Sequence, residues 1–337
     1  MPDEGFARPR KGKMMSDSRQ RTPFPVQRSI LSVEALEEVI RNAYQLKVTG
    51  CELLKPQLSD IYRIDSESGP YILRVYPHSM NLARWIAAEV NVLTALQAVD
   101  LPVSKPIAQT DGRWLLALDA PEGERYAVLY SYARGRSLKR FKDPELYRAF
   151  GRLAASVHAA AENLPPVQDR APLDRYALLA RPMEVISATY PEHWKEVEEL
   201  REVAEQVARM MDQLPQAHPY WGFCHGELNF SNVHVSPEGE LTLFDFEYCG
   251  PGWPVYDIAT VFNFEPLDAA RIFLEGYETL RPLHPRERSA IGWFQIAHKI
   301  WMLGMATSLS SVFGSLMTSG VLLDQVLEFV RETEAAL

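Results

Sequence analysis

The stretch at 223–232 reads Phe-Cys-His-Gly-Glu-Leu-Asn-Phe-Ser-Asn, and the stretch at 243–247 reads Leu-Phe-Asp-Phe-Glu. The first has the form H-x-E-x-x-x-x-N, with Glu227 and Asn232 five residues apart, and the second places Asp245 after an apolar run. The residues between them are typical of a strand, a Pro-Glu-Gly turn and a second strand. Such a hairpin would bring Asn232 and Asp245 close together, one on each arm.

This polar pattern is that of a kinase catalytic loop followed by a metal-binding strand. Transfer of a γ-phosphoryl group needs an acceptor hydroxyl held in line and Mg²⁺ ions on the phosphates. The Glu227 carboxylate can accept the proton of that hydroxyl, and the oxygens of Asn232 and Asp245 are hard ligands of the kind Mg²⁺ takes. The alternative is a chance His-Gly-Glu beside an ordinary buried strand, and the complete pattern argues against it.

Composition excludes several other classes of protein. The chain has 337 residues, long enough for two lobes, and a net charge of −9, which argues against a nucleic-acid binder and fits a cationic or zwitterionic small substrate. Its three cysteines are too few for a disulfide framework or a zinc site, so we expect a reducing cytoplasm. A hydrolase built on Cys224 and His225 lacks an oriented nucleophile–base–acid set.

Two segments carry expectations about targeting. Residues 1–29 are basic and contain several prolines without an apolar core, so we expect a disordered arm and no secretory signal. Met14 or Met15 is an alternative start. Residues 300–323 carry no charge and approach membrane-spanning length, but Gly, Ser and Thr dilute the run. A buried helix pair is favoured there, and no membrane partner is expected.

Residues 30–132 read as a small lobe of antiparallel strands with two helices. Ser32 caps the first helix, and a second at 80–98 carries Glu89 on its apolar stripe. Three strands are expected at Cys51–Leu54, Ile61–Asp65 and Tyr71–Tyr76. On the third strand Arg74 would reach the α- and β-phosphates of ATP, with Glu89 as the partner that orients it. The alternative is that Glu89 lies at the edge of the stripe and reaches water.

Residues 133–337 read as a helical lobe that contains the catalytic segment. A buried strand from Arg125 ends in a hinge at Gly135, where backbone groups around Ser131 to Ala133 would bind the adenine edge. One helix is expected to begin behind Pro254. The other expected helices lie at 144–163, 172–190, 193–213, 267–280, 286–310 and 321–336.

From about residue 33 onward the chain resembles the aminoglycoside phosphotransferase and choline kinase-like family, which includes homoserine kinase-like and stress-response kinases. The resemblance rests on three motifs: His225-Gly-Glu-Leu-x-x-x-Asn232, Phe244-Asp-Phe-Glu-Tyr248 and Tyr256-Asp-Ile-Ala259. It implies an α+β, protein-kinase-like bilobal fold with an ATP cleft between the lobes. It also implies a catalytic role for Glu227, metal binding by Asn232 and Asp245, and loop-shaping roles for His225 and Asp257.

Three departures from the family pattern keep an alternative open. The catalytic carboxylate is Glu instead of Asp, and one extra methylene moves it by roughly 1 Å, a misplacement that can cost about a hundredfold in rate. Arg74 stands where Lys is usual. The phosphate-covering turn, which includes Ser59, lacks Gly and places Asp60 near the expected phosphates. The alternative is a nucleotide-binding pseudokinase with a regulatory or scaffold role.

The sequence points only weakly to the acceptor. Glu247 is placed to face an amine, and His298 within an apolar helix is a second candidate substrate contact. Most of the large aromatic residues nearby are expected to be core. We therefore expect a kinase that phosphorylates a hydroxyl of a small, amine-containing metabolite or antibiotic. The sequence leaves open the acceptor itself, a protein acceptor included, and the oligomeric state.

Overall fold

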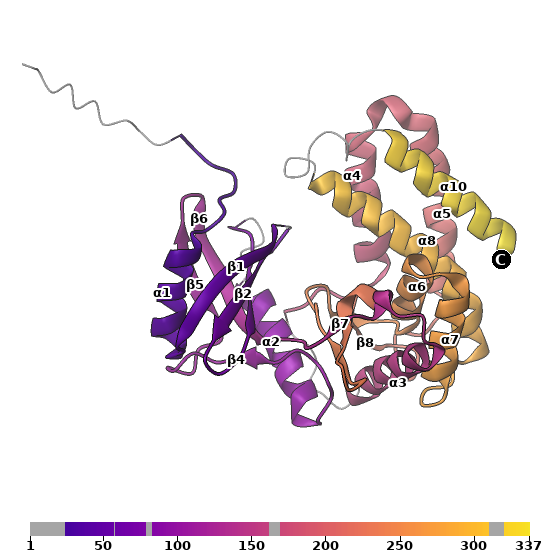
Figure 1. Ribbon diagram of the computed structural model, residues 1–337. Helices are drawn as coiled ribbons and strands as arrows, with labels where there is room; N and C mark the ends of the chain where they lie inside the picture. The colour runs from indigo at the N-terminus through magenta and orange to yellow at the C-terminus, as the bar shows by residue number, and fades with distance from the viewer. Residues whose placement is uncertain (1–23, 57, 79–82, 162–168, 310–319) are drawn as a thin grey trace, which may run out of the picture.

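The computed structural model describes residues 24–56, 58–78, 83–161, 169–309 and 320–337. It divides into a sheet with two helices and a larger, mostly helical part (Figure 1). This is the α+β, kinase-like bilobal architecture expected from the sequence.

The smaller lobe is built on an antiparallel sheet in the order β1-β2-β3-β6-β4, with β5 also paired to β6. Its strands are β1 Val48–Pro56, β2 Asp60–Ser66, β3 Tyr71–Val75, β4 Pro106–Ile107, β5 Leu116–Ala120 and β6 Gly123–Ser131. The three predicted strands are present, and β1 and β2 are longer than predicted. Neither β4 nor β5 was predicted, because β4 is two residues long and β5 is rich in Ala and Asp.

Side-chain alternation explains how the sheet packs on both faces. Leu73 and Leu129 belong to a core cluster with the apolar face of α1 (Val33–Tyr44), which Ser32 caps as expected. Val128 and Tyr130 face the other way and join a second cluster with α2 (Ala83–Ala98). That second cluster continues into the helical lobe. The cleft side of the sheet and α2 therefore share one core with the catalytic region.

The larger lobe holds the catalytic hairpin among helices. Strands β9 (Val233–Val235) and β10 (Leu241–Leu243) pair antiparallel, as predicted. The other short strands are β7 Arg136–Ser137, β8 Gly222–Cys224 and β11 Gly250–Gly252. The helices are α3 Pro144–Ala161, η3 Tyr176–Ala180, α4 Arg181–Thr189, α5 Trp194–Met211, α6 Val255–Phe264, α7 Leu267–Glu278, α8 Pro285–Ser308 and α10 Gly320–Ala336.

One predicted helix begins later than expected. Residues 172–174 are not part of the helical segment that follows, because the Leu173 N–H donates to the Pro251 carbonyl at 2.7 Å. This bridge keeps the chain extended beside β11, and η3 begins at Tyr176. The uncharged run at 300–323 divides between the end of α8 and the start of α10, and residues 310–319 lie outside the described residues. None of the described helices combines the length and the apolar character that crossing a bilayer requires.

The end of the predicted disordered arm is ordered, and this corrects two expectations. Arg28 forms an ion pair with Asp60, and the Ser29 N–H donates to Glu122 at 3.1 Å. Asp60 is fully buried and also pairs with Arg125 at 2.7 Å, so its charge is compensated within the lobe instead of facing phosphates. The rest of the predicted arm, residues 1–23, lies outside the described residues.

Candidate active site

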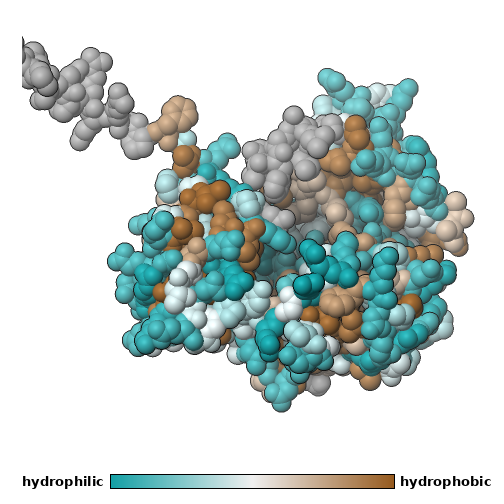
Figure 2. All heavy atoms as spheres, in the orientation of Figure 1, coloured by the Kyte–Doolittle hydropathy of each residue, from teal (hydrophilic) through white to brown (hydrophobic). Residues whose placement is uncertain are grey.

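A cavity of about 910 Å³ lies between the sheet and the helical lobe. In Figure 2 the two lobes meet along a recess with hydrophilic side chains around it. Most of the predicted site residues line the cavity: Ser59, Arg74, Glu89, Ser131, Ala133, Glu227, Asn232, Asp245 and Glu247. Residues separated by more than 180 positions in the sequence therefore face one space, as a catalytic site between lobes requires.

Asp257 holds the loop that carries Glu227 by hydrogen bonds to two backbone N–H groups. The two Asp257 oxygens accept hydrogen bonds from the His225 N–H at 2.6 Å and the Gly226 N–H at 2.8 Å. His158 contacts the same carboxylate at 2.9 Å. Because Asp257 sits in the first turn of α6, the positive end of the helix dipole also favours its charge. These contacts fit the loop-shaping position that the sequence predicts for Asp257.

The His225 ring connects this loop to the segment that follows β10. Its Nδ1 accepts from the Glu227 N–H at 3.3 Å, so Nε2 carries the proton and donates to the Phe244 carbonyl at 3.0 Å. Burial lowers the pKa of His225, which favours this neutral form. The residue next to Asp245 is thereby tied to the loop that carries Glu227.

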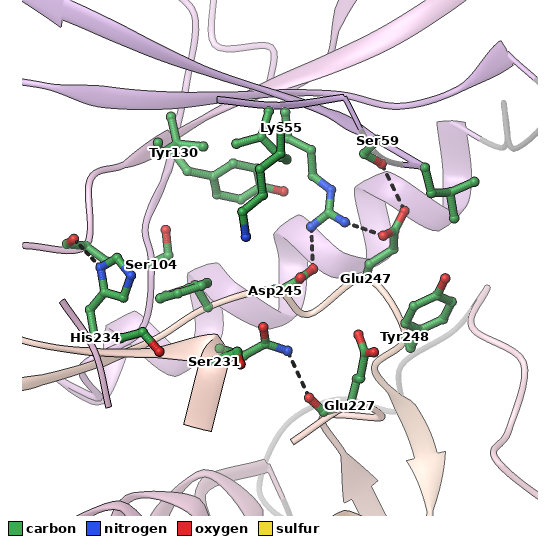
Figure 3. A pocket seen from close by; sticks show the side chains of 18 of the residues that line it. Lys55, Ser59, Ser104, Tyr130, Glu227, Ser231, His234, Asp245, Glu247 and Tyr248 are labelled. Carbon is green, nitrogen blue, oxygen red and sulfur yellow. Dashed lines mark hydrogen bonds and ion pairs between the residues drawn. The ribbon is translucent and has the colours of Figure 1, made fainter. Parts of the chain in front are cut away.

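The Glu227 side chain projects into the cavity without a hydrogen-bond partner among the described residues (Figure 3). Its backbone carbonyl is held by the amide groups of Asn232 at 2.9 Å and Asn229 at 3.1 Å. Burial, with Asp245 and Glu247 nearby, raises the pKa of the Glu227 carboxyl to about 7. The main chain is therefore fixed, and the carboxylate remains available for proton transfer near neutral pH.

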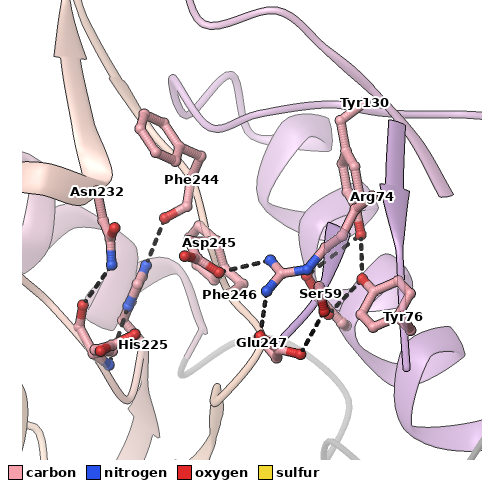
Figure 4. Close-up of polar contacts among 12 residues, drawn as sticks. Ser59, Arg74, Tyr76, Tyr130, His225, Asn232, Phe244, Asp245, Phe246 and Glu247 are labelled. Atoms are coloured by element: carbon pink, nitrogen blue, oxygen red, sulfur yellow. Dashed lines mark hydrogen bonds and ion pairs between the residues drawn. The ribbon is translucent and has the colours of Figure 1, made fainter. Parts of the chain in front are cut away.

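Arg74 joins Asp245 and Glu247, the two acidic residues that follow β10 (Figure 4). One guanidinium nitrogen donates to Asp245 Oδ1 at 2.6 Å, and the other donates to Glu247. Ser59 Oγ also donates to Glu247, at 3.1 Å. Asp245 has a left-handed φ of +69°, a conformation that Asp tolerates better than most residues. The cation predicted for the nucleotide phosphates thus contacts carboxylates of the opposite lobe.

Glu89 is not hydrogen-bonded to Arg74, which corrects the predicted pairing. It accepts from the Tyr76 hydroxyl at 3.1 Å and the Tyr130 hydroxyl at 3.3 Å, and it contacts Arg170 at 3.4 Å. The alternative that Glu89 reaches water is also wrong, because the residue is 2 % exposed. The physical reason is that Asp245 and Glu247 already occupy the Arg74 guanidinium, so the buried Glu89 requires another cation.

His298 does not line the cavity, so it cannot contact a substrate there. It is fully buried in α8 and is hydrogen-bonded through Nδ1 to the Asn263 amide at 2.9 Å. Burial lowers the pKa of its imidazole to about 3, so the ring is neutral. Trp301 lies between His298 and the site, since its ring stacks on the imidazole at 5.9 Å and lines the cavity. The apolar surroundings explain why His298 belongs to the core.

The hinge presents a backbone N–H group to the cavity. The Ser131 carbonyl accepts from Ser104 Oγ at 3.1 Å, and the Ala133 carbonyl contacts His234 Nδ1 at 2.8 Å. The Ala133 N–H has no hydrogen-bond partner among the residues that the structure describes. A buried N–H beside a cavity is a site for an acceptor atom of a ligand, such as a ring nitrogen of a purine.

A family model described as the phosphotransferase enzyme family matches residues 51–289, which is more than half of the chain. The chain belongs to this phosphotransferase family. The resemblance inferred from the three motifs is therefore confirmed. Within the family this chain carries Glu227 in the catalytic-loop motif, and that loop lies inside the matched residues.

Relatives and solved structures agree with this membership. A protein of Deinococcus radiodurans is 30% identical over 322 residues and covers 92% of both chains. The homoserine kinase of Caulobacter sp. is 27% identical over 252 residues, 68% of this chain and 71% of the relative. The structure of a microcompartment-associated aminopropanol kinase superposes with a TM-score of 0.73 at 19% identity, covering 89% of this chain and 94% of the other. Amicoumacin kinase hAmiN, in complex with AMP-PNP, Ca²⁺ and Ami, has a TM-score of 0.69 at 18% identity, covering 90% and 93%.

At this level of identity the two superpositions establish the fold alone, and the family match establishes the enzyme class. This phosphotransferase is a kinase whose acceptor is a hydroxyl group.

Two cavity residues of this phosphotransferase, Lys55 and Tyr248, and one residue outside the cavity lining, Arg170, were not anticipated, whereas Trp301 belonged to an aromatic set expected to wall a pocket or to be core. Lys55 of β1 extends its amine into the cavity (Figure 3), and Tyr248 and Trp301 form one wall with their rings 5.0 Å apart. Arg170 lies behind Asp245 and Glu247. Tyr248 could have been predicted from the sequence, because it follows Glu247 in the motif at 244–248. Arg170 stands alone in a polar segment, where no pattern distinguishes it from a surface residue.

Proposed function

We propose that this protein transfers the γ-phosphate of ATP, with Mg²⁺, to a hydroxyl of a small amine-containing acceptor. The observation that carries the proposal is Glu227, a carboxylate free of hydrogen bonds among the described residues and directed into a cavity it shares with Asn232 and Asp245. A base must lie within hydrogen-bond reach of the proton it accepts, and a free side chain at the cavity wall satisfies that need. The family supplies the reaction class, and the roles of these residues belong to the proposal.

Two cations and the hinge support a nucleotide in the cavity. Lys55 and Arg74 both line it on the side of the sheet, where they would balance phosphate charge. The free Ala133 N–H would donate to the base. The AMP-PNP complex of the related amicoumacin kinase agrees with a nucleotide donor. In this arrangement Arg74 would exchange its contact with Asp245 for the phosphates, and Ser59 would cover them.

The donor set fits Mg²⁺ held jointly by protein and nucleotide. Within the described ranges no cluster of three or more His, Cys, Asp or Glu side chains could hold a metal by itself. Asn232 donates its NH₂ to the Glu227 carbonyl, which leaves its amide oxygen available to a metal ion, and Asp245 in the same cavity would supply the carboxylate such a site needs. When bound, Mg²⁺ would neutralise charge on the transferred phosphate. Glu227 would then accept the acceptor hydroxyl's proton, while the fixed loop keeps the carboxylate in place.

The acceptor end of the cavity favours a cation. Glu227 and Glu247 face it together, and the Tyr248–Trp301 wall offers aromatic faces to which ammonium groups are attracted. Burial raises the pKa of Glu247, against the lowering effect of Arg74, so a nearby ammonium would favour its charged form. The relatives named for aminopropanol and homoserine act on acceptors that combine an amine with a hydroxyl, which agrees with this choice.

The test is γ-phosphate transfer from Mg²⁺-ATP to a panel of amino alcohols, amino sugars and homoserine, each paired with its analogue lacking the amine. Product is expected with at least one amine-containing hydroxyl compound. It should fall at least tenfold with the amine-free analogue and vanish in Asp245→Ala. ATP binding without product from any acceptor, a generic protein substrate included, would contradict the proposal and favour a pseudokinase.

A further inference from the structure

The backbone around Asp245 is held on both sides, and the two sides are held differently. Upstream, Leu243 exchanges main-chain hydrogen bonds with the segment at 102–104, at 2.8 and 2.9 Å. Downstream, the Phe246 carbonyl accepts from the Cys249 N–H at 3.0 Å, and one side chain also contacts the carbonyls of residues 246 and 247. Arg170 Nη1 donates to the Glu247 carbonyl at 2.6 Å, and Nη2 lies 3.4 Å from the Phe246 carbonyl.

Arg170 is built into the protein interior. Its side chain is 4 % exposed, and its guanidinium lies over the Trp85 ring at 5.7 Å from the centroid. The same guanidinium contacts Glu89 Oε2 at 3.4 Å. A buried arginine is costly unless it is paired and hydrogen-bonded. Here one carboxylate and two carbonyls pair with Nη1 and Nη2 of Arg170, while its Nε has no hydrogen-bond partner among the described residues. Arg170 therefore connects α2 to residues 246 and 247.

The conformation of Asp245 explains why this support matters. A left-handed φ of +69° is sparsely populated for a residue other than Gly, and it persists where the surroundings over-determine it. Carbonyl contacts immediately downstream restrict how residues 246 and 247 can turn. Without them we expect residues 245–247 to lose part of this restraint, so that the Asp245 carboxylate would hold its position in the cavity less firmly.

We propose that Arg170 is a positioning residue for phosphoryl transfer, which holds the main chain at Phe246 and Glu247 so that Asp245 keeps its metal-binding orientation. Because Arg170 also contacts Glu89, it fixes the position of α2 relative to residues 245–247. This inference rests on the proposed function, in which Asp245 binds the metal ion. In this proposal Glu89 pairs with Arg170, whereas the sequence predicts that it orients Arg74.

The test distinguishes an effect of Arg170 on how Mg²⁺ enhances nucleotide binding from an effect on the stability of the protein. Binding of the ATP analogue AMP-PNP is measured calorimetrically with and without Mg²⁺ for the wild type, Arg170→Met and Arg170→Lys, and the melting temperature and kcat are measured in parallel. Arg175→Met is the matched control, since Arg175 makes an exposed pair with Asp212 at 2.8 Å in the same region. In Arg170→Met we expect the affinity for AMP-PNP without metal to stay within about twofold of wild type. The factor by which Mg²⁺ increases this affinity should become at least tenfold smaller, and kcat should fall about a hundredfold. Arg170→Lys should recover little, because one ammonium cannot reach all three acceptors.

A double variant covers the case in which Arg170→Met is unstable. Glu89→Gln together with Arg170→Met removes both charges, so it should recover most of the melting temperature while the response to Mg²⁺ stays weak. A folded Arg170 variant with wild-type Mg²⁺ response and kcat would overturn the positioning role alone. A wild-type protein whose nucleotide affinity ignores Mg²⁺ would overturn the proposed function, and the positioning role with it.

Discussion

In the proposed function the chemistry depends on the carboxylate at position 227, which is Glu where the family motif has Asp. Two side-chain amides hold the main chain of Glu227, and its carboxylate has no hydrogen-bond partner in the part of the chain that the structure describes. The extra methylene therefore extends the carboxylate into the cavity from a fixed base. Because the raised pKa lies near 7, the longer side chain retains the basicity that proton transfer requires.

Shortening this side chain tests whether its length is matched to the cavity. In Glu227→Asp the carboxylate should withdraw by roughly 1 Å, so kcat should fall about ten- to a hundredfold while the KM for ATP changes little. Steady-state kinetics with the best acceptor measures both quantities. Turnover equal to or faster than wild type would mean that the loop adjusts to the shorter residue.

His298 gives a pH-dependent contribution to stability. Its pKa is about 3 in the folded protein and near 6.5 when unfolded, so the unfolded chain binds a proton first as pH falls. Stability is therefore intact above about pH 6.5 and decreases below it, by about 2 kcal/mol between pH 7 and pH 5. His298→Asn keeps an acceptor for Asn263 and removes the titration. Urea unfolding at both pH values should show a loss smaller by about that amount in the variant; equal losses would contradict a buried neutral imidazole.

At the scale of elements, the catalytic loop and hairpin could be predicted because their signals are local. The H-x-E-x-x-x-x-N spacing, the turn and the Asp after an apolar run all lie within 25 consecutive positions. The partners of Glu89 and Asp60 could not be predicted in the same way. Arg170 and Arg125 lie 81 and 65 residues away from them, and only the fold decides which cation reaches a buried carboxylate.

The turn that carries Glu227 requires glycine at 226, where φ is +90° and an added Cβ would lie 2.3 Å from the Tyr248 carbonyl oxygen. Gly226→Ala should therefore displace the loop and reduce kcat at least about a hundredfold. Gly239→Ala is the control, since it has a similar φ of +86° and nothing within 4 Å. It should cost only about 1 kcal/mol and leave kcat near wild type. Equal kinetic losses in both variants would show that φ strain, and not the contact with Tyr248, governs the loop.

At the scale of the whole molecule, charge pairs cross the cleft in both directions. Arg74 of the sheet contacts carboxylates of the helical lobe, and Arg170 of the helical lobe contacts Glu89 of α2. These pairs set the two lobes around one cavity before a nucleotide is present. Helices and strands could be predicted from the sequence because their periodicity is local, and the resemblance of the three motifs to the family implied the fold class. The cross-cleft pairs and the position of His298 in the core needed the structure.

The most direct test of the account compares wild type with Glu227→Gln in two measurements on the same samples. Glutamine keeps the size of the side chain and removes the base, so γ-phosphate transfer to the best acceptor should fall by roughly 10²–10⁴-fold. The affinity for Mg²⁺-ATP should stay within about threefold, because the loop and the metal ligands are unchanged. Normal turnover in Glu227→Gln would contradict the central claim that this carboxylate accepts the proton of the acceptor hydroxyl.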